Sequence, residues 1–89
     1  MVRELVERRL IACGTMVPGC SSIYRWKGAV EEAAEVVVLL KTTAGRWEGL
    51  QQALPGLHPY EVPELLAVPV SAGLESYLAW LRAETGDAP

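Results

Sequence analysis

Hydrophobic residues are densest in the stretch 13–43, where their pattern is that of two long β-strands. The first strand, CGTMVPGCSSIYRW at 13–26, and the second, VEEAAEVVVLLKTT at 30–43, are joined by a turn at Lys27-Gly28. The second strand contains an unbroken apolar run from Val36 to Leu40. Because side chains on a strand alternate between its faces, this run is apolar on both sides of the sheet. One face can pack against the chain's own helices, and the other predicts a second cover, such as another subunit.

Apolar residues at helical spacing precede and follow this hairpin. Gly14 is expected to end the first helix, Thr42 or Thr43 to cap the second, and Pro55-Gly56 to close or kink it. The predicted order is a helix over 2–12, the two strands, a helix over 47–57, a strand over 62–70, a helix over 74–81, and a frayed tail over 84–89.

Prolines limit two of the predicted strands. Pro18-Gly19 cannot continue a central ladder, so we expect a bulge or bend there, near a sheet edge. Pro63 and Pro69 leave only the residues between them free to form ladder hydrogen bonds, which predicts that the strand over 62–70 lies near an edge or a subunit boundary.

Composition favours one domain, residues 1–89, that associates with itself. Of the 89 residues, 51% are hydrophobic, whereas a domain of this size buries only roughly 60–65% of the surface that its unfolded chain exposes. The net charge is −3 and the basic residues are scattered, which argues against nucleic-acid binding. No stretch approaches the ~18 apolar residues of a membrane span. Cys13 and Cys20 lie about 23 Å apart on one extended strand and cannot pair, which favours a reduced, cytoplasmic protein.

Candidate chemistry is sparse. His58 is the only histidine, and with Glu61 and Glu64 nearby it is either a metal or anion ligand or a loop histidine bound to backbone. Cys13 is either a thiolate ligand or a small buried residue that fills space in the core. Lys41, at the end of an apolar strand, either solvates the strand end or faces an anionic ligand.

Aromatic residues could line a ligand pocket, but in a small domain they more often fill a core or an interface. Tyr24, Trp26 and Trp80 are the members of this group that we assign to an interface. No phosphate-binding glycine loop, nucleophile elbow, CxxC pair or HExxH helix is present in the sequence. A single histidine without a plausible nucleophile and base predicts that the protein is not an enzyme.

Several motifs, in order and together covering Leu5 to Gly86, resemble the CutA family of divalent cation tolerance proteins. The most specific are SIYRWKG at 22–28, LKTT at 40–43, HPYEVPE at 58–64 and YLAWL at 77–81. The resemblance implies an α+β, ferredoxin-like fold of βαββαβ type, with an antiparallel sheet that carries its helices on one face. It also implies a tight homotrimer similar to the PII signalling proteins, which agrees with the doubly apolar strand and the surplus hydrophobicity.

The sequence departs from the family at its start. The family begins with an apolar strand and the first half of the first helix, and this chain starts within that helix. In the ferredoxin-like order 4-1-3-2 the missing strand lies between the strands at 30–43 and 62–70, and its loss leaves a gap of about 10 Å. We therefore expect either a shortened form of the natural protein or another occupant of the gap. Comparison of the natural protein's intact mass with 9.7 kDa tests this expectation.

The metal ligands implied by the family are only partly present. Copper ligands proposed for family members include a cysteine on the missing strand and a histidine pair before Pro-Tyr, and here only His58 carries over. The resemblance thus implies at most a weak Cu(II) site at His58 with Glu61 or Glu64, and Cys13 is a substitute at best.

Three functions remain open from the sequence. The first is a non-enzymatic trimer associated with tolerance of divalent metal, chiefly copper. The second is a PII-like trimer that binds a small molecule in its inter-subunit clefts, and the third is a structural scaffold. The residues proposed for such a cleft are Tyr24, Trp26, Lys41, His58, Tyr60 and Trp80.

Overall fold

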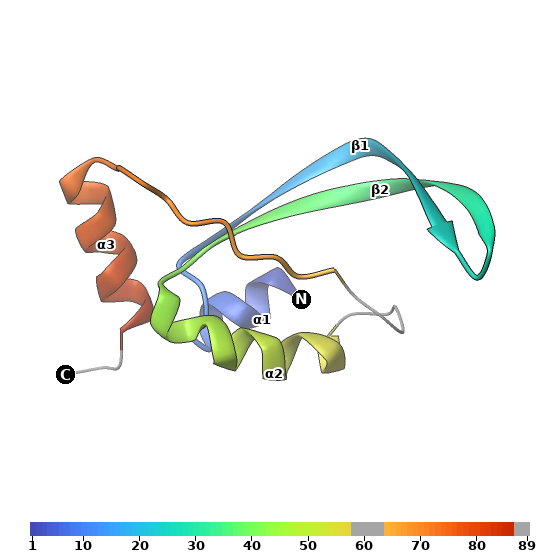
Figure 1. Cartoon of the computed structure of the whole chain (residues 1–89). Helices are drawn as coiled ribbons and strands as arrows, with labels where there is room; N and C mark the ends of the chain where they lie inside the picture. Colours follow the sequence, from blue (N-terminus) through green and yellow to red (C-terminus); the bar gives the residue numbers. More distant parts are fainter. Residues whose placement is uncertain (58–63, 87–89) are drawn as a thin grey trace.

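The computed structural model describes residues 1–57 and 64–86. A two-stranded antiparallel sheet, β1 (Cys13–Trp26) and β2 (Ala29–Lys41), rises from a base formed by α1 (Val2–Glu7) and α2 (Trp47–Leu57). An extended segment then leads to α3 (Glu75–Thr85), which stands at the end of the base opposite the hairpin tip (Figure 1). The long hairpin gives the molecule a longest dimension of 49 Å.

The predicted hairpin and its turn are confirmed. Trp26 pairs with Ala29 across a two-residue turn, and both turn residues have positive φ, 49° at Lys27 and 84° at Gly28. This is the type I′ geometry whose twist matches that of the flanking strands. A glycine is favoured at the second position because a side chain there would strain the backbone.

The bulge predicted at Pro18-Gly19 is also confirmed. Val17 pairs with Val37 and Cys20 pairs with Glu35, so Pro18 and Gly19 together stand opposite one residue of β2. Gly19 has a φ of 79°, which a glycine adopts without steric cost. The extra residue reverses the alternation of β1, so that odd-numbered side chains before the bulge share a face with even-numbered ones after it.

The core lies where the base of the hairpin meets the helices. Leu5 and Ile11 are fully buried, and Leu10 and Leu50 complete the cluster with them. Leu40 of β2 packs against this cluster, which identifies the face of the hairpin that looks toward α1 and α2. An added Cβ at Gly14 would lie only 2.5 Å from Val2 Cγ1, so a residue without a side chain is needed where α1 approaches β1.

Two predicted helix ends are wrong. The first helix ends at Glu7 rather than at residue 12, because Arg9 adopts a left-handed φ of 58° and the Leu10 N–H donates back to the Leu5 carbonyl. Gly14, predicted to end this helix, instead lies inside β1. At the other end, Glu84 and Thr85 belong to α3 rather than to a frayed tail, because the Thr85 side chain is buried and its hydroxyl donates to the Leu81 carbonyl at 2.7 Å.

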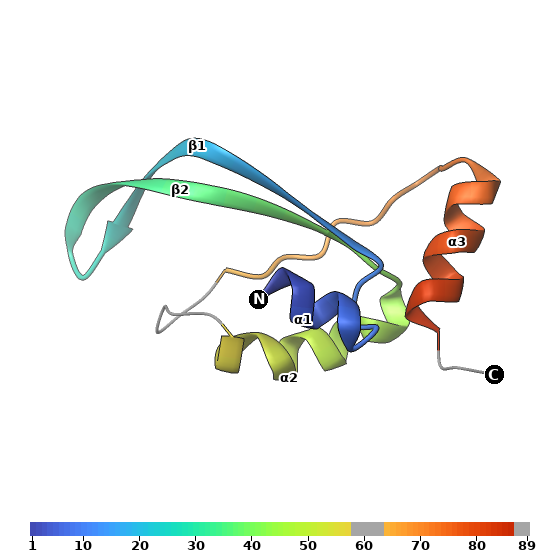
Figure 2. The same ribbon diagram turned by 180° about the vertical axis from the view of Figure 1, so that it is seen from behind.

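The strand predicted over 62–70 is wrong for its described part. Residues 64–74 carry no regular secondary structure, and none of the described backbone groups of 64–73 hydrogen-bonds to the sheet. Figures 1 and 2 show this segment on the same side of α1 and α2 as the hairpin, and Leu65 packs against the core. Pro69 lacks an N–H, and no neighbouring described strand offers a ladder, so apolar composition alone does not make this segment a strand.

Candidate functional site

The bulge places the predicted cleft residues of the hairpin on one face. Directly paired residues of an antiparallel ladder share a face, so Lys41 lies on the same face as Cys13, its partner. After the bulge this face continues through Tyr24, which pairs with Glu31, and Trp26. Without the extra residue, Tyr24 and Trp26 would lie on the face that carries Leu40 and meets the helices. We call the face of Lys41, Tyr24 and Trp26 the outer face of the hairpin.

The outer face is strongly apolar and exposed. Val37 and Leu39, which lie on it between Lys41 and the bulge, are 43% and 52% exposed. Tyr24 and Trp26 are exposed to a similar extent, and the Lys27 ammonium lies 5.7 Å from the centre of the Trp26 ring. Large apolar and aromatic side chains that are exposed on one face of a folded domain indicate an interaction site.

Lys41 contacts two other side chains of the outer face. Its ammonium donates a hydrogen bond to Thr15 Oγ1 and lies 3.7 Å from Cys13 Sγ. The side chain is half-buried. The amine therefore lies against neighbouring side chains at the base of the hairpin, and its role, solvating the strand end or facing an anionic ligand, stays a prediction.

The remaining cleft candidates are not brought to Lys41 within one subunit. Lys41 is ten residues along β2 from Glu31, the partner of Tyr24, which corresponds to about 33 Å at the usual rise of a strand. Trp80 lies on α3, at the far end of the molecule from the hairpin tip (Figure 2). His58 and Tyr60 lie outside the described residues. The six residues can form one cleft only if neighbouring subunits contribute to it, so that cleft stays a prediction.

The predicted metal ligands are likewise not assembled by the described part of the chain. His58 and Glu61 lie outside it, and Glu64 is exposed. Among residues 1–57 and 64–86, no three histidine, cysteine, aspartate or glutamate side chains form a group that could hold a metal ion. The copper site therefore stays a prediction centred on His58.

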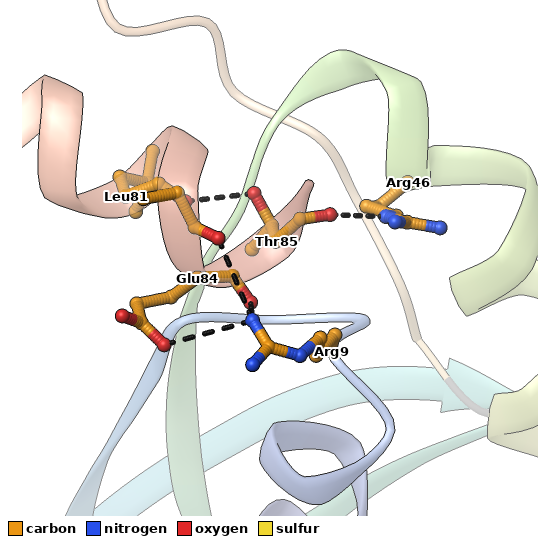
Figure 3. Close-up of polar contacts among 6 residues, drawn as sticks. Arg9, Arg46, Leu81, Glu84 and Thr85 are labelled. Carbon is orange, nitrogen blue, oxygen red and sulfur yellow. Dashed lines mark hydrogen bonds and ion pairs between the residues drawn. The ribbon is translucent and has the colours of Figure 1, made fainter. Parts of the chain in front are cut away.

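Two arginines that the sequence did not single out attach α3 to the base (Figure 3). The Arg9 guanidinium donates to the carbonyls of Ala83 and Glu84, at 3.5 and 3.4 Å, and lies 3.8 Å from the Glu84 carboxylate. Arg46 Nε donates to the Thr85 carbonyl. These carbonyls belong to the last turn of a helix, which lacks intrahelical donors and attracts cations. No sequence signal points to these contacts, because Arg9 falls within the helix predicted over 2–12 and the partners of both arginines are backbone carbonyls.

Two concave surfaces adjoin these elements. An apolar groove of about 670 Å³ runs between α1 and the hairpin, and Met16, Val36 and Val38 supply its hairpin side. A smaller pocket of about 400 Å³ lies between α1 and α3, where Trp80 and Glu84 face Arg9. The ring of Trp80 also packs against Tyr77, with 5.6 Å between ring centres. Both surfaces are open, and neither contains a nucleophile with an adjacent base.

Fold and surface together define a class: an α+β protein of ferredoxin-like, PII-like architecture whose sheet is left partly uncovered. The fold class predicted from the sequence is confirmed by solved structures. The divalent cation tolerance protein Cut A1 from Thermus thermophilus superposes with a TM-score of 0.92 at 48% identity, over 96% of this chain and 82% of that one. The PII-like protein CutA from Nostoc sp. PCC 7120, in apo form, gives 0.87 at 39% identity, over 96% and 83%.

Sequence comparison identifies the family. The pattern of the CutA1 divalent ion tolerance protein family matches residues 1–84. A divalent-cation tolerance protein CutA from Thermus thermophilus is 48% identical over 86 residues, 97% of this chain and 84% of the relative. One from Escherichia coli O139:H28 is 41% identical over 83 residues, 93% and 74%. The chain belongs to the CutA1 family, as the resemblance predicted, and these relatives are named as tolerance proteins rather than as enzymes.

Proposed function

We propose that this protein is a non-enzymatic homotrimer that takes part in tolerance of divalent cations, as the names of its relatives state for them. The observation that carries the proposal is the outer face of the hairpin. Val37 and Leu39 leave about half of their surface in water there, and burial of that remaining half would stabilise the structure by roughly 1 kcal/mol for each side chain. Association that covers these apolar side chains in every subunit removes part of the surplus of exposed apolar residues, and a closed ring does so equally in all subunits.

The compartment we propose is the cytoplasm. Both cysteines are free thiols, as expected for a reducing environment. Separately, the described part of the chain contains no helix with the length and apolar character needed to cross a bilayer.

Within the metal role, we propose a weak Cu(II) site. His58 is the principal ligand, and Glu61 or Glu64 supplies a carboxylate. The support is the chemistry of the donors, since imidazole and carboxylate suit Cu(II), together with the motif that surrounds His58 in the sequence.

Native mass spectrometry with one equivalent of Cu(II) per subunit tests both the homotrimer and the copper site. A trimer that takes up copper, and that loses it in His58→Ala but not in the matched surface variant Glu48→Gln, supports the assembly and the site. A trimer with the same copper uptake in His58→Ala refutes the site and leaves the assembly standing. A monomer at micromolar concentration refutes the trimer.

A second candidate, a PII-like trimer that binds a small molecule between subunits, is favoured by the shared face of Lys41, Tyr24 and Trp26. A cation and two aromatic rings on one face, too far apart to meet within a subunit, are suited to an anionic, ring-containing ligand held where two subunits abut. Deletion of Gly19 provides a sharp test because it removes the extra residue of the bulge and turns Tyr24 and Trp26 to the opposite face.

The readout for this second candidate is the melting temperature with a panel of anionic metabolites, since a ligand selective for the folded state must stabilise it. A metabolite should raise the melting temperature of the unaltered protein and of Gly45→Ala, where no atom lies within 4 Å of the added Cβ, but not that of the Gly19 deletion. If neither metals nor metabolites shift it, the remaining interpretation is a structural scaffold.

A further inference from the structure

The base of the hairpin brings a thiol and an amine together in a way that neither tolerance of metal nor cleft binding requires. Cys13 and Lys41 are direct partners in the antiparallel ladder, so their Cβ atoms point to the same side and lie about 5 Å apart. At the ends of the side chains, 3.7 Å separates Lys41 Nζ from Cys13 Sγ. Both residues are partly buried at the end of the hairpin that is anchored to the core.

Thr15 holds the amine in this position. Thr15 follows Cys13 by two residues on β1 and therefore lies on the same face, where its hydroxyl accepts a hydrogen bond from the Lys41 ammonium. The lysine chain is thereby fixed along the outer face above the thiol, instead of extending into water. A flexible lysine would occupy such a position only a small part of the time, because four rotatable bonds would have to be ordered.

From this geometry we infer that Cys13 and Lys41 form an oxidation-dependent covalent link, with hydrogen peroxide as the co-substrate. In the first step the Cys13 sulfur attacks peroxide. The peroxide O–O bond breaks, sulfur is oxidised by two electrons to the sulfenic acid, and water leaves. In the second step the unprotonated Lys41 amine attacks the sulfur, the S–O bond breaks, and the hydroxyl departs with an amine proton as a second water.

The product is a sulfenamide, in which Sγ of Cys13 is bonded to Nζ of Lys41. Relative to the starting chain it has lost two hydrogens, and peroxide has been reduced to two waters, so atoms and electrons balance. Condensation of a sulfenic acid with a nearby nitrogen is established chemistry for backbone amides, and an amine is the better nucleophile. Attack by a thiol on the S–N bond reverses the reaction.

Cys20, the other cysteine of the chain, serves as an internal control for Cys13. Cys20 Sγ lies 3.6 Å from the Val17 carbonyl, and no described lysine contacts it. The chain contains only two lysines, and the other, Lys27, is at the hairpin turn. Cys13 and Cys20 are too far apart along β1 to form a disulfide within one chain. The structure thus selects one thiol and one amine.

The experiment treats the folded protein with hydrogen peroxide and measures intact mass without reductant. We expect a loss of two hydrogens that dithiothreitol restores. Tryptic digestion should join residues 10–25 to residues 28–46, because trypsin cannot cleave after a modified Lys41. Cys20→Ser should behave like the unaltered chain, and Cys13→Ser should form no link. Lys41→Arg, which keeps the charge but lacks a comparable nucleophile, should stop at a sulfenic acid that dimedone traps at Cys13.

Several outcomes would overturn the inference. Equal dimedone labelling of Cys13 in the unaltered chain and in Lys41→Arg would show that the amine does not intercept the sulfenic acid. A link that forms equally well in denaturant would show that the folded geometry has no part in it. An unreactive Cys13, a link through Lys27, or a disulfide between subunits would each exclude the assigned pair. Circular dichroism of Lys41→Arg checks that this variant is folded.

Discussion

The base of the molecule and the outer face of its hairpin both carry large apolar side chains, but these have opposite surroundings. In the base, Leu5 and Ile11 have no exposed surface, and α1, α2 and the ends of both strands enclose them. On the outer face of the hairpin, Leu39 is 52% exposed and Val37 is 43% exposed. Apolar residues of the same kind therefore fold the chain in one region and remain available for association in the other. The distinction lies in what covers them, not in which residues they are.

The largest expected effect on stability comes from a substitution in the core of the base. Leu5→Ala removes a fully buried side chain and should lower the free energy of unfolding by about 2–5 kcal/mol in urea titrations. Val68→Ala, in the exposed segment 64–74, is the matched control and should change it by less than about 0.5 kcal/mol. Equal effects of the two substitutions would mean that the segment is as firmly packed as the core.

The next prediction concerns the outer face. Leu39→Asp should weaken self-association by about 1.5–3 kcal/mol per subunit, roughly ten- to 150-fold in the equilibrium constant for the loss of one subunit, because a charge replaces a side chain that association buries. Sedimentation velocity over a concentration series measures it. Glu31→Gln, an exposed change near the tip, serves as the control. An unaltered oligomer in Leu39→Asp would remove this face from the interface.

Gly14 joins the two regions, where β1 leaves the base. Gly14→Ala should destabilise the fold by about 1–3 kcal/mol, since the added Cβ would lie 2.5 Å from Val2 Cγ1 and α1 would have to shift. Gly45→Ala meets no atom within 4 Å and should be neutral or slightly stabilising. Chemical denaturation of the two variants under the same conditions distinguishes crowding from a general intolerance of alanine for glycine.

The smallest effect is expected for the attachment of α3. Arg9→Met removes three partly exposed contacts to the last turn of α3 and should cost about 0.5–1 kcal/mol, with a change in Trp80 fluorescence as α3 loosens. Arg8→Met, which loses only the exposed contact to Glu4 within α1, should leave the fluorescence unchanged. Fluorescence that changes in neither variant would show that Arg46 alone is sufficient to hold α3.

Sequence patterns predicted the elements that local chemistry specifies. The hairpin, its Lys27-Gly28 turn and the bulge at Pro18-Gly19 follow from strand alternation and from backbone angles that only certain residues adopt readily. The errors are at elements that depend on distant partners. The first helix ends early through the left-handed Arg9, Thr85 is helical because the base buries it, and 64–74 is not a strand because no described neighbour pairs with it.

For the candidate site, too, the sequence shows the residue types, whereas the tertiary structure decides how they are arranged. The residue types at Lys41, Tyr24 and Trp26 are evident from the sequence, but their common face follows from how the bulge shifts the register of β1 against β2. The contact between Cys13 and Lys41 joins residues 28 positions apart and exists only because that register pairs them. The contacts of Arg9 and Arg46 with α3 could not be predicted from the sequence. Their partners, the carbonyls of the last turn of α3, are backbone groups common to every helix.

The sequence by itself determined the family, the α+β class, the hairpin with its turn and bulge, and the surplus of apolar residues that self-association would cover. These features depend on composition, periodicity and local backbone geometry, which are properties of neighbouring residues. Tertiary structure alone decided where α1 and α3 end, which face of the hairpin looks outward, and which thiol meets which amine. Each of these depends on contacts between segments far apart in the chain, and the free energy of such contacts is set by packing and register.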